Sequence, residues 1–499
     1  MKKEEAIQKL NDLERKLYSC RHLNSQVYLD SVTAAPPDTA DGRGTALEFL
    51  NNLQYQIQVS EETGELLNEL DGMKSELSPV QARQVFYLLR EYNETKKIPQ
   101  KEYVDYTLLL NNAESVWHKA KAASDFASFA PYLQKILDTN IRFAGYLRPD
   151  MDPYDGMLDQ FERGMNMKFL DSFFNEIRKP IVNLVREISR CRQIDNEFLK
   201  RYYPAEQQRK LSQYLMKVET IDPNHCTIGE TEHPFTLEFN KYDVRITTHY
   251  YEHDLLSSMY SVLHEGGHAI YELSTGDNLL YTSLAGGASM SLHESQSRFF
   301  ENYIGRSEAF LQAIFPAILE IFPEQLAGIT PHQFYRAANR VEPSLIRTEA
   351  DELTYCLHVM LRYEIEKMMV HKEIKINEVP HVWNQKIKEY FDLKVPDDKH
   401  GCLQDSHWAG GSLGYFPSYA LGNAYGVQIA ARMSKEVDIR KCTSEANLMP
   451  VRSWLTDHLY QYGLMYEPRE TFEKAAGEPF SARYYIEYLT NKYTRLYSE

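Results

Sequence analysis

The chain has 499 residues, is 43% hydrophobic and carries a formal net charge of −16, so it can bury a large core and is strongly acidic. An acidic chain argues against partners that are polyanions, and we therefore expect neither nucleic-acid nor membrane binding. The sequence contains no run of about 18 apolar residues, so we expect no transmembrane helix. The N-terminal segment lacks the apolar stretch of a signal peptide. The six cysteines are widely spaced and are expected to be reduced thiols, which indicates a cytoplasmic protein.

Helical periodicity dominates the chain from one end to the other. The predicted helices are 3–34, 45–72, 79–94, 101–123, 129–145, 168–192, 207–218, 255–273, 290–305, 307–321, 331–340, 347–372, 382–392, 418–434, 446–459 and 468–496. Breaks are predicted at Pro36-Pro37, from Pro149 to Pro153 and at Pro343. No repeat and no low-complexity linker divides the chain. We expect a mainly α protein with a single domain over residues 1–499, in which roughly residues 1–75 form a helical lid.

The stretch 233–251 differs, because apolar and polar residues alternate along it. Phe235, Leu237 and Phe239 fall on one face of a strand, and a second run continues the alternation from Val244. This pattern predicts a β-hairpin directly before the next helix. A small sheet at this place has a possible use, since an exposed edge strand can hydrogen-bond an extended peptide.

The predicted helix 255–273 carries the segment HEGGH. His264 and His268 are four residues apart, so both imidazoles face the same side of a helix and can reach one ion. Catalytic zinc usually has three protein ligands and a water, and Glu265 would lie beside that water as a general base. The alternative interpretation is an ordinary helix with a chance pair of histidines.

Two adjacent glycines inside this helix need an explanation. Gly266 and Gly267 each cost a helix interior roughly 1 kcal/mol relative to alanine. Close approach of a neighbouring backbone or of a substrate would explain them, because glycine has no Cβ.

The third metal ligand is expected from residues 291–303. Glu294 follows His268 by 26 residues, which allows a loop and a return helix that packs beside the first. His293 is the alternative ligand, and Glu301 is a candidate partner behind the ligands.

Six segments together resemble the carboxypeptidase Taq family of metallocarboxypeptidases, and in particular its bacillus-type members. They are HPF at 233–235, DVRIT at 243–247, HEGGH at 264–268, HESQ at 293–296, IRTEAD at 346–351 and GCLQDSHW at 401–408, with weaker matches at 117–133 and 154–165. One departure lies at Leu29-Asp30, where the family would have a tryptophan before the aspartate. The resemblance implies an almost all-helical fold with a deep groove and a small sheet at the groove wall. It also implies a homodimer, and activity on peptides with broad specificity that disfavours proline.

Peptide hydrolysis needs a donor for the oxyanion besides the metal, and residues 405–422 offer three candidates. This stretch is similar to the HxAGG…Tyr segment of the thimet-oligopeptidase group, which favours Tyr419 as the donor, with a role for His407 and with Tyr415 as the alternative. The angiotensin-converting enzyme group shares the His-Pro pair, and this similarity suggests that His233 binds a substrate carbonyl.

A carboxypeptidase must also recognise the free carboxylate of its substrate, and arginine offers a bidentate fork for it. Arg347, at the start of the predicted helix 347–372, and Arg245, in the hairpin, are the two candidates. Asp351 and Asp405 are expected to orient other site residues.

The leading hypothesis is a zinc carboxypeptidase that releases single C-terminal residues, with cobalt as a possible metal. Metal-activated water would attack the last peptide bond with Glu265 as the base. One alternative is an endo-acting zinc oligopeptidase with the same chemistry. The other is a non-catalytic helical binding protein with a relict metal site, against which the intact Glu265 argues.

Overall fold

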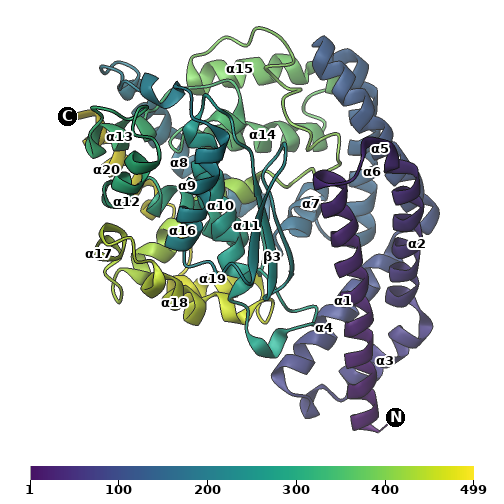
Figure 1. Cartoon of the computed structure of the whole chain (residues 1–499). Helices are drawn as coiled ribbons and strands as arrows, with labels where there is room; N and C mark the ends of the chain where they lie inside the picture. The colour runs from purple at the N-terminus through teal and green to yellow at the C-terminus, as the bar shows by residue number, and fades with distance from the viewer. Residues whose placement is uncertain (1, 499) are drawn as a thin grey trace.

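The computed structural model describes residues 2–498, and helices account for most of them (Figure 1). The helices before the sheet are α1 (Lys3–Thr33), α2 (Ala40–Val59), α3 (Glu61–Gly72), α4 (Pro79–Lys97), α5 (Gln100–Ala123), α6 (Phe126–Leu147), α7 (Pro153–Phe161), α8 (Met167–Ile188) and α9 (Ala205–Val218). The helices after it are α10 (Leu255–Leu273), α11 (Met290–Arg298), α12 (Glu308–Ile321), α13 (Pro331–Ala338), α14 (Tyr355–Val370), α15 (Val379–Phe391), α16 (Pro417–Met433), α17 (Ile439–Ser444), α18 (Met449–His458), α19 (Pro468–Ala476) and α20 (Arg483–Ser498). The predicted mainly α fold is confirmed.

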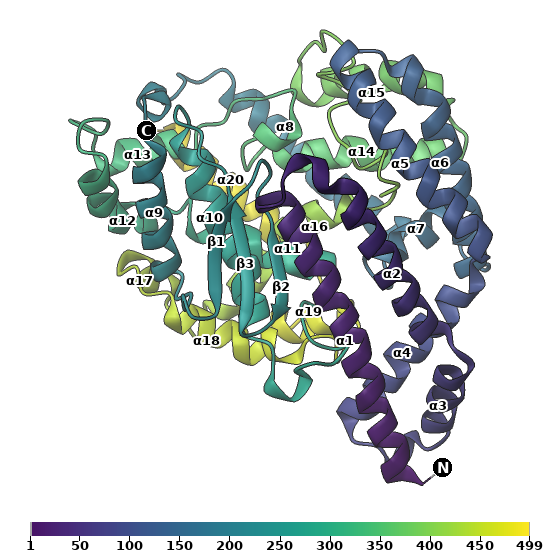
Figure 2. The same cartoon turned by 45° about the vertical axis from the view of Figure 1, so that its right-hand side comes forward.

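A three-stranded sheet lies at the centre of the molecule, in the strand order β1-β3-β2. The strands are β1 (Cys226–Glu230), β2 (Thr236–Asn240) and β3 (Asp243–Thr248). β2 and β3 form the antiparallel hairpin that the alternation predicted. β1 pairs in parallel with β3 and was not predicted, since its sequence CTIGE carries little apolar alternation. β2 is therefore an edge strand, and α1 runs beside it (Figure 2).

The core divides into two parts. A large apolar core unites the sheet with the helices from α5 to α20. A second, smaller cluster joins apolar side chains of α1, α3 and α4. The N-terminal helices thus have a core of their own, which continues past residue 75 into α4. The role of this segment as a lid stays a prediction.

Several predicted helix boundaries were wrong. The predicted helix 45–72 is two helices, because Ser60 is extended and its side chain accepts the N–H of Thr63 to begin α3. Helix α7 (Pro153–Phe161) was not predicted, and it begins where the predicted break from Pro149 to Pro153 ends. Asp152 caps it, and its proline occupies the first turn, where no N–H is needed. The predicted helix 446–459 corresponds to α18, whereas the predicted helix 468–496 is divided into α19 and α20 after Gly477, which adopts a left-handed conformation with φ of 74°.

The correction that matters most for function concerns the predicted helix 347–372. Arg347–Glu349 is a separate 3₁₀ turn, and α14 begins only at Tyr355. Asp351 accepts the backbone N–H groups of Leu353 and Thr354, so the chain turns there instead of continuing a helix. Arg347 therefore lies outside the long helix.

The expectations about membrane helices and cysteines can be compared with the structure of residues 2–498. Within this range, no helix is both long and apolar enough to cross a membrane. All six cysteines are free thiols.

Candidate active site

Helix α10 spans the predicted residues, and both of its glycines lie against a neighbour. A Cβ at Gly267 would be 2.6 Å from the backbone oxygen of Gln296 in α11, so the expected close approach of a backbone is confirmed. A Cβ at Gly266 would overlap the carboxyl group of Glu219, which is fully buried. The two glycines let α11 and the end of α9 pack directly against the HEGGH turn.

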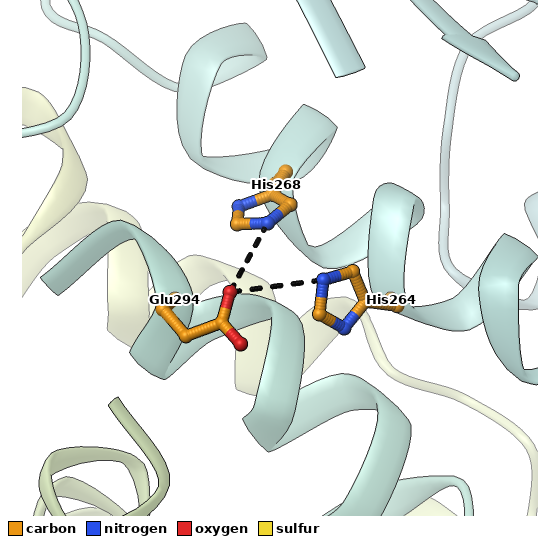
Figure 3. A group of neighbouring side chains, drawn as sticks. All are labelled: His264, His268 and Glu294. Carbon is orange, nitrogen blue, oxygen red and sulfur yellow. Dashed lines mark ion pairs between the residues drawn. The ribbon is translucent and has the colours of Figure 1, made fainter. Parts of the chain in front are cut away.

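The structure brings His264, His268 and Glu294 together (Figure 3). Oε2 of Glu294 lies 3.7 Å from Nε2 of His264 and 3.6 Å from Nε2 of His268. These distances exceed normal hydrogen bonds. Two ligands held about 2.0–2.1 Å from one tetrahedral zinc ion lie about 3.4 Å apart, so the three atoms fit a shared ion.

Both imidazoles are held by their other nitrogen. Nδ1 of His264 lies 2.9 Å from Oε2 of Glu301, which takes the position expected for a partner behind the ligands. Nδ1 of His268 lies 2.6 Å from Nδ1 of His293, whose Nε2 contacts Glu272 at 2.6 Å. Because both ring nitrogens of His293 are already engaged, the structure favours Glu294 as the third ligand. Burial lowers the pKa of His268 to about 3, which favours the neutral form that binds metals.

A buried arginine that the sequence analysis missed organises the two carboxylates. Nε of Arg298 donates to Oε1 of Glu294 at 2.7 Å, and its Nη1 donates to Glu301 at 2.9 Å. Burial raises the pKa of Glu294, but Arg298 and then His264 outweigh it and leave this carboxyl ionised. Arg298 occupies Oε1, so Oε2 is the oxygen left to face the histidines. Arg298 follows Glu294 by four residues, and this helical spacing is the sequence signal that could have identified it.

The candidate base, Glu265 of α10, is hydrogen-bonded by a residue of the edge strand β2. Glu265 is 6% exposed, and the hydroxyl of Thr236 lies 2.7 Å from its Oε2 and 3.0 Å from its backbone oxygen. Burial raises the pKa of Glu265, and His264 partly offsets the effect. Thr236 was missed, although the alternation that places Leu237 on one face of the strand places Thr236 on the other.

Arg347 is the centre of a buried polar cluster. It is 7% exposed, and its Nε and Nη2 both lie 2.9 Å from Oδ1 of Asp405. Its Nη1 donates to Oη of Tyr355 at 2.9 Å. Asp405 also accepts from Nε of Arg362 at 2.7 Å, so this aspartate fixes two arginines. Asp351 instead serves backbone N–H groups, as described above.

His407, Tyr415 and Tyr419 lie together beside this cluster. Nε2 of His407 is 3.2 Å from Oη of Tyr419, and its ring stacks on Tyr415 with centroids 5.7 Å apart. Burial and then Arg347 lower the pKa of His407 to about 4, so the imidazole is neutral near pH 7. Burial raises the pKa of Tyr419, which keeps its proton.

Helix α16 links this group to the metal ligands. A Cβ at Gly422 would be 2.6 Å from Cγ of Glu294, so α16 packs directly on the predicted third ligand. Tyr419 precedes Gly422 by three residues and shares its helix face. The predicted oxyanion donor therefore lies next to the predicted metal site.

Two predicted substrate-binding residues lie elsewhere. Arg245 forms an ion pair with Asp243 of its own strand, with two N–O distances of 2.9 Å, and lies over the ring of Phe239. It pairs with Leu237 in the sheet, on the face opposite to Thr236. His233 is exposed in the loop before β2. The substrate-binding roles of Arg245 and His233 stay predictions.

A cavity of about 560 Å³ lies between α1, α2, the outer end of β2 and the loop 275–286. Glu238 and Asn240 of β2 line it, together with Glu272 of α10. Glu272 contacts His293, which contacts His268, so two side chains separate the cavity from the proposed ligand His268.

A histidine pair on one helix, a glutamate from the next helix and a buried glutamate beside them define a helical metallopeptidase of the HExxH class. The chain belongs to the carboxypeptidase Taq (M32) family of metallopeptidases, whose family model matches residues 9–493. It is 38% identical to carboxypeptidase 1 of Bacillus subtilis, with 97% of each chain covered, and 32% identical to thermostable carboxypeptidase 1 of Pyrococcus furiosus, with 98% of each covered.

Solved structures agree with this assignment. The M32 carboxypeptidase of Deinococcus radiodurans superposes with a TM-score of 0.96 at 33% identity, covering 99% of this chain and 100% of that one. Metallocarboxypeptidase 1 of Trypanosoma cruzi superposes over 99% of this chain and 100% of that one, at 30% identity. The predicted enzyme class, a metallocarboxypeptidase that depends on a divalent metal, is thereby confirmed.

Proposed function

We propose that the protein is a zinc carboxypeptidase that releases single residues from peptide C-termini with broad specificity. The observation that carries the proposal is the packing of α16 on Glu294. This contact brings Tyr419, and with it the Arg347 cluster, next to the His-His-Glu donor set. One site then contains the groups for hydrolysis and a cation for a chain end.

The donor set fits a catalytic metal ion. His264, His268 and Glu294 would hold it, and two imidazoles with one carboxylate are a common set at catalytic zinc. Cobalt would accept the same donors. When bound, the ion would lower the pKa of a water molecule and polarise the scissile carbonyl.

Glu265 is proposed as the general base. Thr236 donates to Oε2, which leaves Oε1 to accept a proton from the attacking water and return it to the leaving amine. Its raised pKa makes it a better base than an exposed glutamate while burial shields it from bulk solvent.

Tyr419 is proposed to donate a hydrogen bond from its phenolic hydroxyl to the oxyanion. Neutral His407, 3.2 Å away, is proposed to orient this hydroxyl. Tyr415 lies 5.0 Å from Tyr419, ring to ring, and remains the alternative donor.

Arg347 is the proposed receptor for the substrate carboxylate. Of its five N–H donors, three are used by Asp405 and Tyr355, which leaves one on each terminal nitrogen for a bidentate contact. Arg245 is the second candidate, with its guanidinium occupied by Asp243. We further propose that His233 contacts a substrate carbonyl and that the upstream part of the peptide lies in the cavity beside β2.

The family resemblance supports a homodimer, and the free cysteines and acidic charge support a cytoplasmic location. The function is tested by mass spectrometry of a mixed peptide digest, with and without chelator. Stepwise loss of C-terminal residues that chelation abolishes is the expected result. Internal cleavage would favour the endo-acting oligopeptidase, and intact peptides would favour the binding protein with a relict site.

A further inference from the structure

Tyr355 lies where the two halves of the site meet. It is the first residue of α14 and is 6% exposed. The guanidinium of Arg298 lies 4.4 Å from the centre of its ring, and Nη1 of Arg347 donates to its hydroxyl at 2.9 Å. The ring of Tyr419 meets it edge-on, with centroids 6.4 Å apart and an interplanar angle of 89°.

The ring side of Tyr355 belongs to the metal site. Arg298 binds Oε1 of Glu294 and Oε2 of Glu301, so its position decides which oxygen of the third ligand faces the histidines. A cation over an aromatic ring in a desolvated site is stabilised electrostatically. The ring therefore holds Arg298 against both carboxylates.

The hydroxyl side of Tyr355 belongs to the substrate site. Asp405 binds Arg347 along one edge of the guanidinium, and the hydroxyl binds it at Nη1. Two anchors at different nitrogens fix the plane of the group and the direction of its two unused N–H donors. With Asp405 alone, the guanidinium could rotate within its pocket.

We propose that Tyr355 is a positioning residue whose hydroxyl aims Arg347 at the substrate carboxylate and whose ring holds Arg298 against the metal-binding glutamate. The first half rests on the proposed function of Arg347, and the second half does not. The two parts share no contact atom, so substitutions can separate them.

The first variant is Tyr355→Phe in the full-length, zinc-loaded protein, which removes the hydroxyl and keeps the ring. The KM for free-acid peptides should rise about tenfold, because a hydrogen bond to a charged group is lost, with a smaller change in kcat. Metal content should be unchanged, and the preference for free-acid over C-terminally amidated peptides should narrow. Tyr363→Phe is the matched control: this tyrosine is also buried in α14, its hydroxyl binds Asp171 at 2.8 Å, and its loss should change none of these quantities.

The second variant is Tyr355→Leu, which removes the ring as well. Affinity for zinc, measured by chelator competition, should fall about tenfold because the cation loses its aromatic partner. Comparison with Tyr355→Phe is the rescue test: phenylalanine should restore zinc affinity and leave the KM defect. Loss of zinc by Tyr355→Phe, or equal zinc affinity in Tyr355→Leu and the parent, would overturn the separation of roles.

A double variant tests whether the hydroxyl acts through Arg347. In an Arg347→Ala background, Tyr355→Phe should add no further rise in KM, since the group that it positions is gone. An additive rise would overturn the positioning role. If Arg347→Ala alone leaves the acid-to-amide preference unchanged, the proposed function of Arg347 fails, while the zinc affinity of Tyr355→Leu still decides the role of the ring.

Discussion

The metal side and the carboxylate side of the site are built in different ways. His264 and His268 lie one turn apart on α10, and Glu294 comes from α11, which packs against it through Gly267. Arg347 lies in a short 3₁₀ turn, and Asp405, its main partner, is 58 residues away in a segment without regular structure. Two regular helices set the first geometry, whereas long-range side-chain contacts set the second.

This difference has an energetic consequence. On the metal side each of the three proposed ligands should be indispensable, because a catalytic zinc ion usually has only three protein ligands. On the carboxylate side several hydrogen bonds together position and bind the substrate carboxylate, so the loss of one of them should weaken substrate binding only partly. Substitutions on the two sides should therefore differ in kind as well as in size.

The largest effect is expected from the ligands. His264→Ala, His268→Ala or Glu294→Ala should lose both bound zinc and activity, measured by metal analysis and peptide hydrolysis. Glu320→Ala, an exposed glutamate of α12, is the control and should retain both. Full metal occupancy in Glu294→Ala would exclude Glu294 as a ligand and would make His293 the candidate third ligand.

Glu265→Gln should separate chemistry from metal binding. Glutamine keeps the size and the contact with Thr236 but accepts no proton, so turnover should fall at least about 10²-fold with zinc retained. Metal content and kcat are measured on the same preparation. Near-normal turnover in the zinc-loaded variant would exclude Glu265 as the base.

Arg347→Ala should show the graded behaviour of the carboxylate side. Loss of a charge-assisted contact should lower kcat/KM on free-acid peptides about ten- to hundredfold, while zinc content stays the same. Cleavage of amidated peptides should change less, because they lack the carboxylate. Unaltered discrimination between the two would make Arg347 structural.

Gly267→Ala should affect the packing of the two ligand helices. Its Cβ would lie 2.6 Å from the Gln296 oxygen, so α11 must shift, at a cost of about 1–3 kcal/mol in the free energy of unfolding. Gly145→Ala in α6 is the control, since no atom within 4 Å meets its Cβ, and it should be neutral or stabilising. Thermal unfolding compares the two, and equal stability would contradict the close contact.

Arg245→Ala should have the smallest effect. Its ion pair with Asp243 is partly exposed and contributes less than about 1 kcal/mol, and the sheet register turns it away from Thr236. The fall in kcat/KM on free-acid peptides should be smaller than for Arg347→Ala. A fall in kcat/KM larger than that of Arg347→Ala would indicate that Arg245, and not Arg347, binds the substrate carboxylate.

The same contrast explains what the sequence predicted. Apolar spacing and the HEGGH segment predicted α10 to the residue, and the hairpin followed from its alternation, because both patterns are local. The predicted start of the helix that became α14 was wrong. Asp351 also accepts the N–H of Glu342, and such a contact across a turn leaves no trace in the apolar periodicity. Thr236 was missed for the same reason, since its partner Glu265 is 29 residues away.

The most direct test of the account compares one peptide as the free acid with the same peptide as its C-terminal amide, both incubated with the zinc-loaded protein. Mass spectrometry over time reports which bonds are cut. We predict that the free acid loses single residues from its C-terminus and that the amide is cut about ten- to hundredfold more slowly, because it lacks the carboxylate that Arg347 is proposed to bind. Cleavage of both peptides at equal rates, or at internal bonds, would contradict the account.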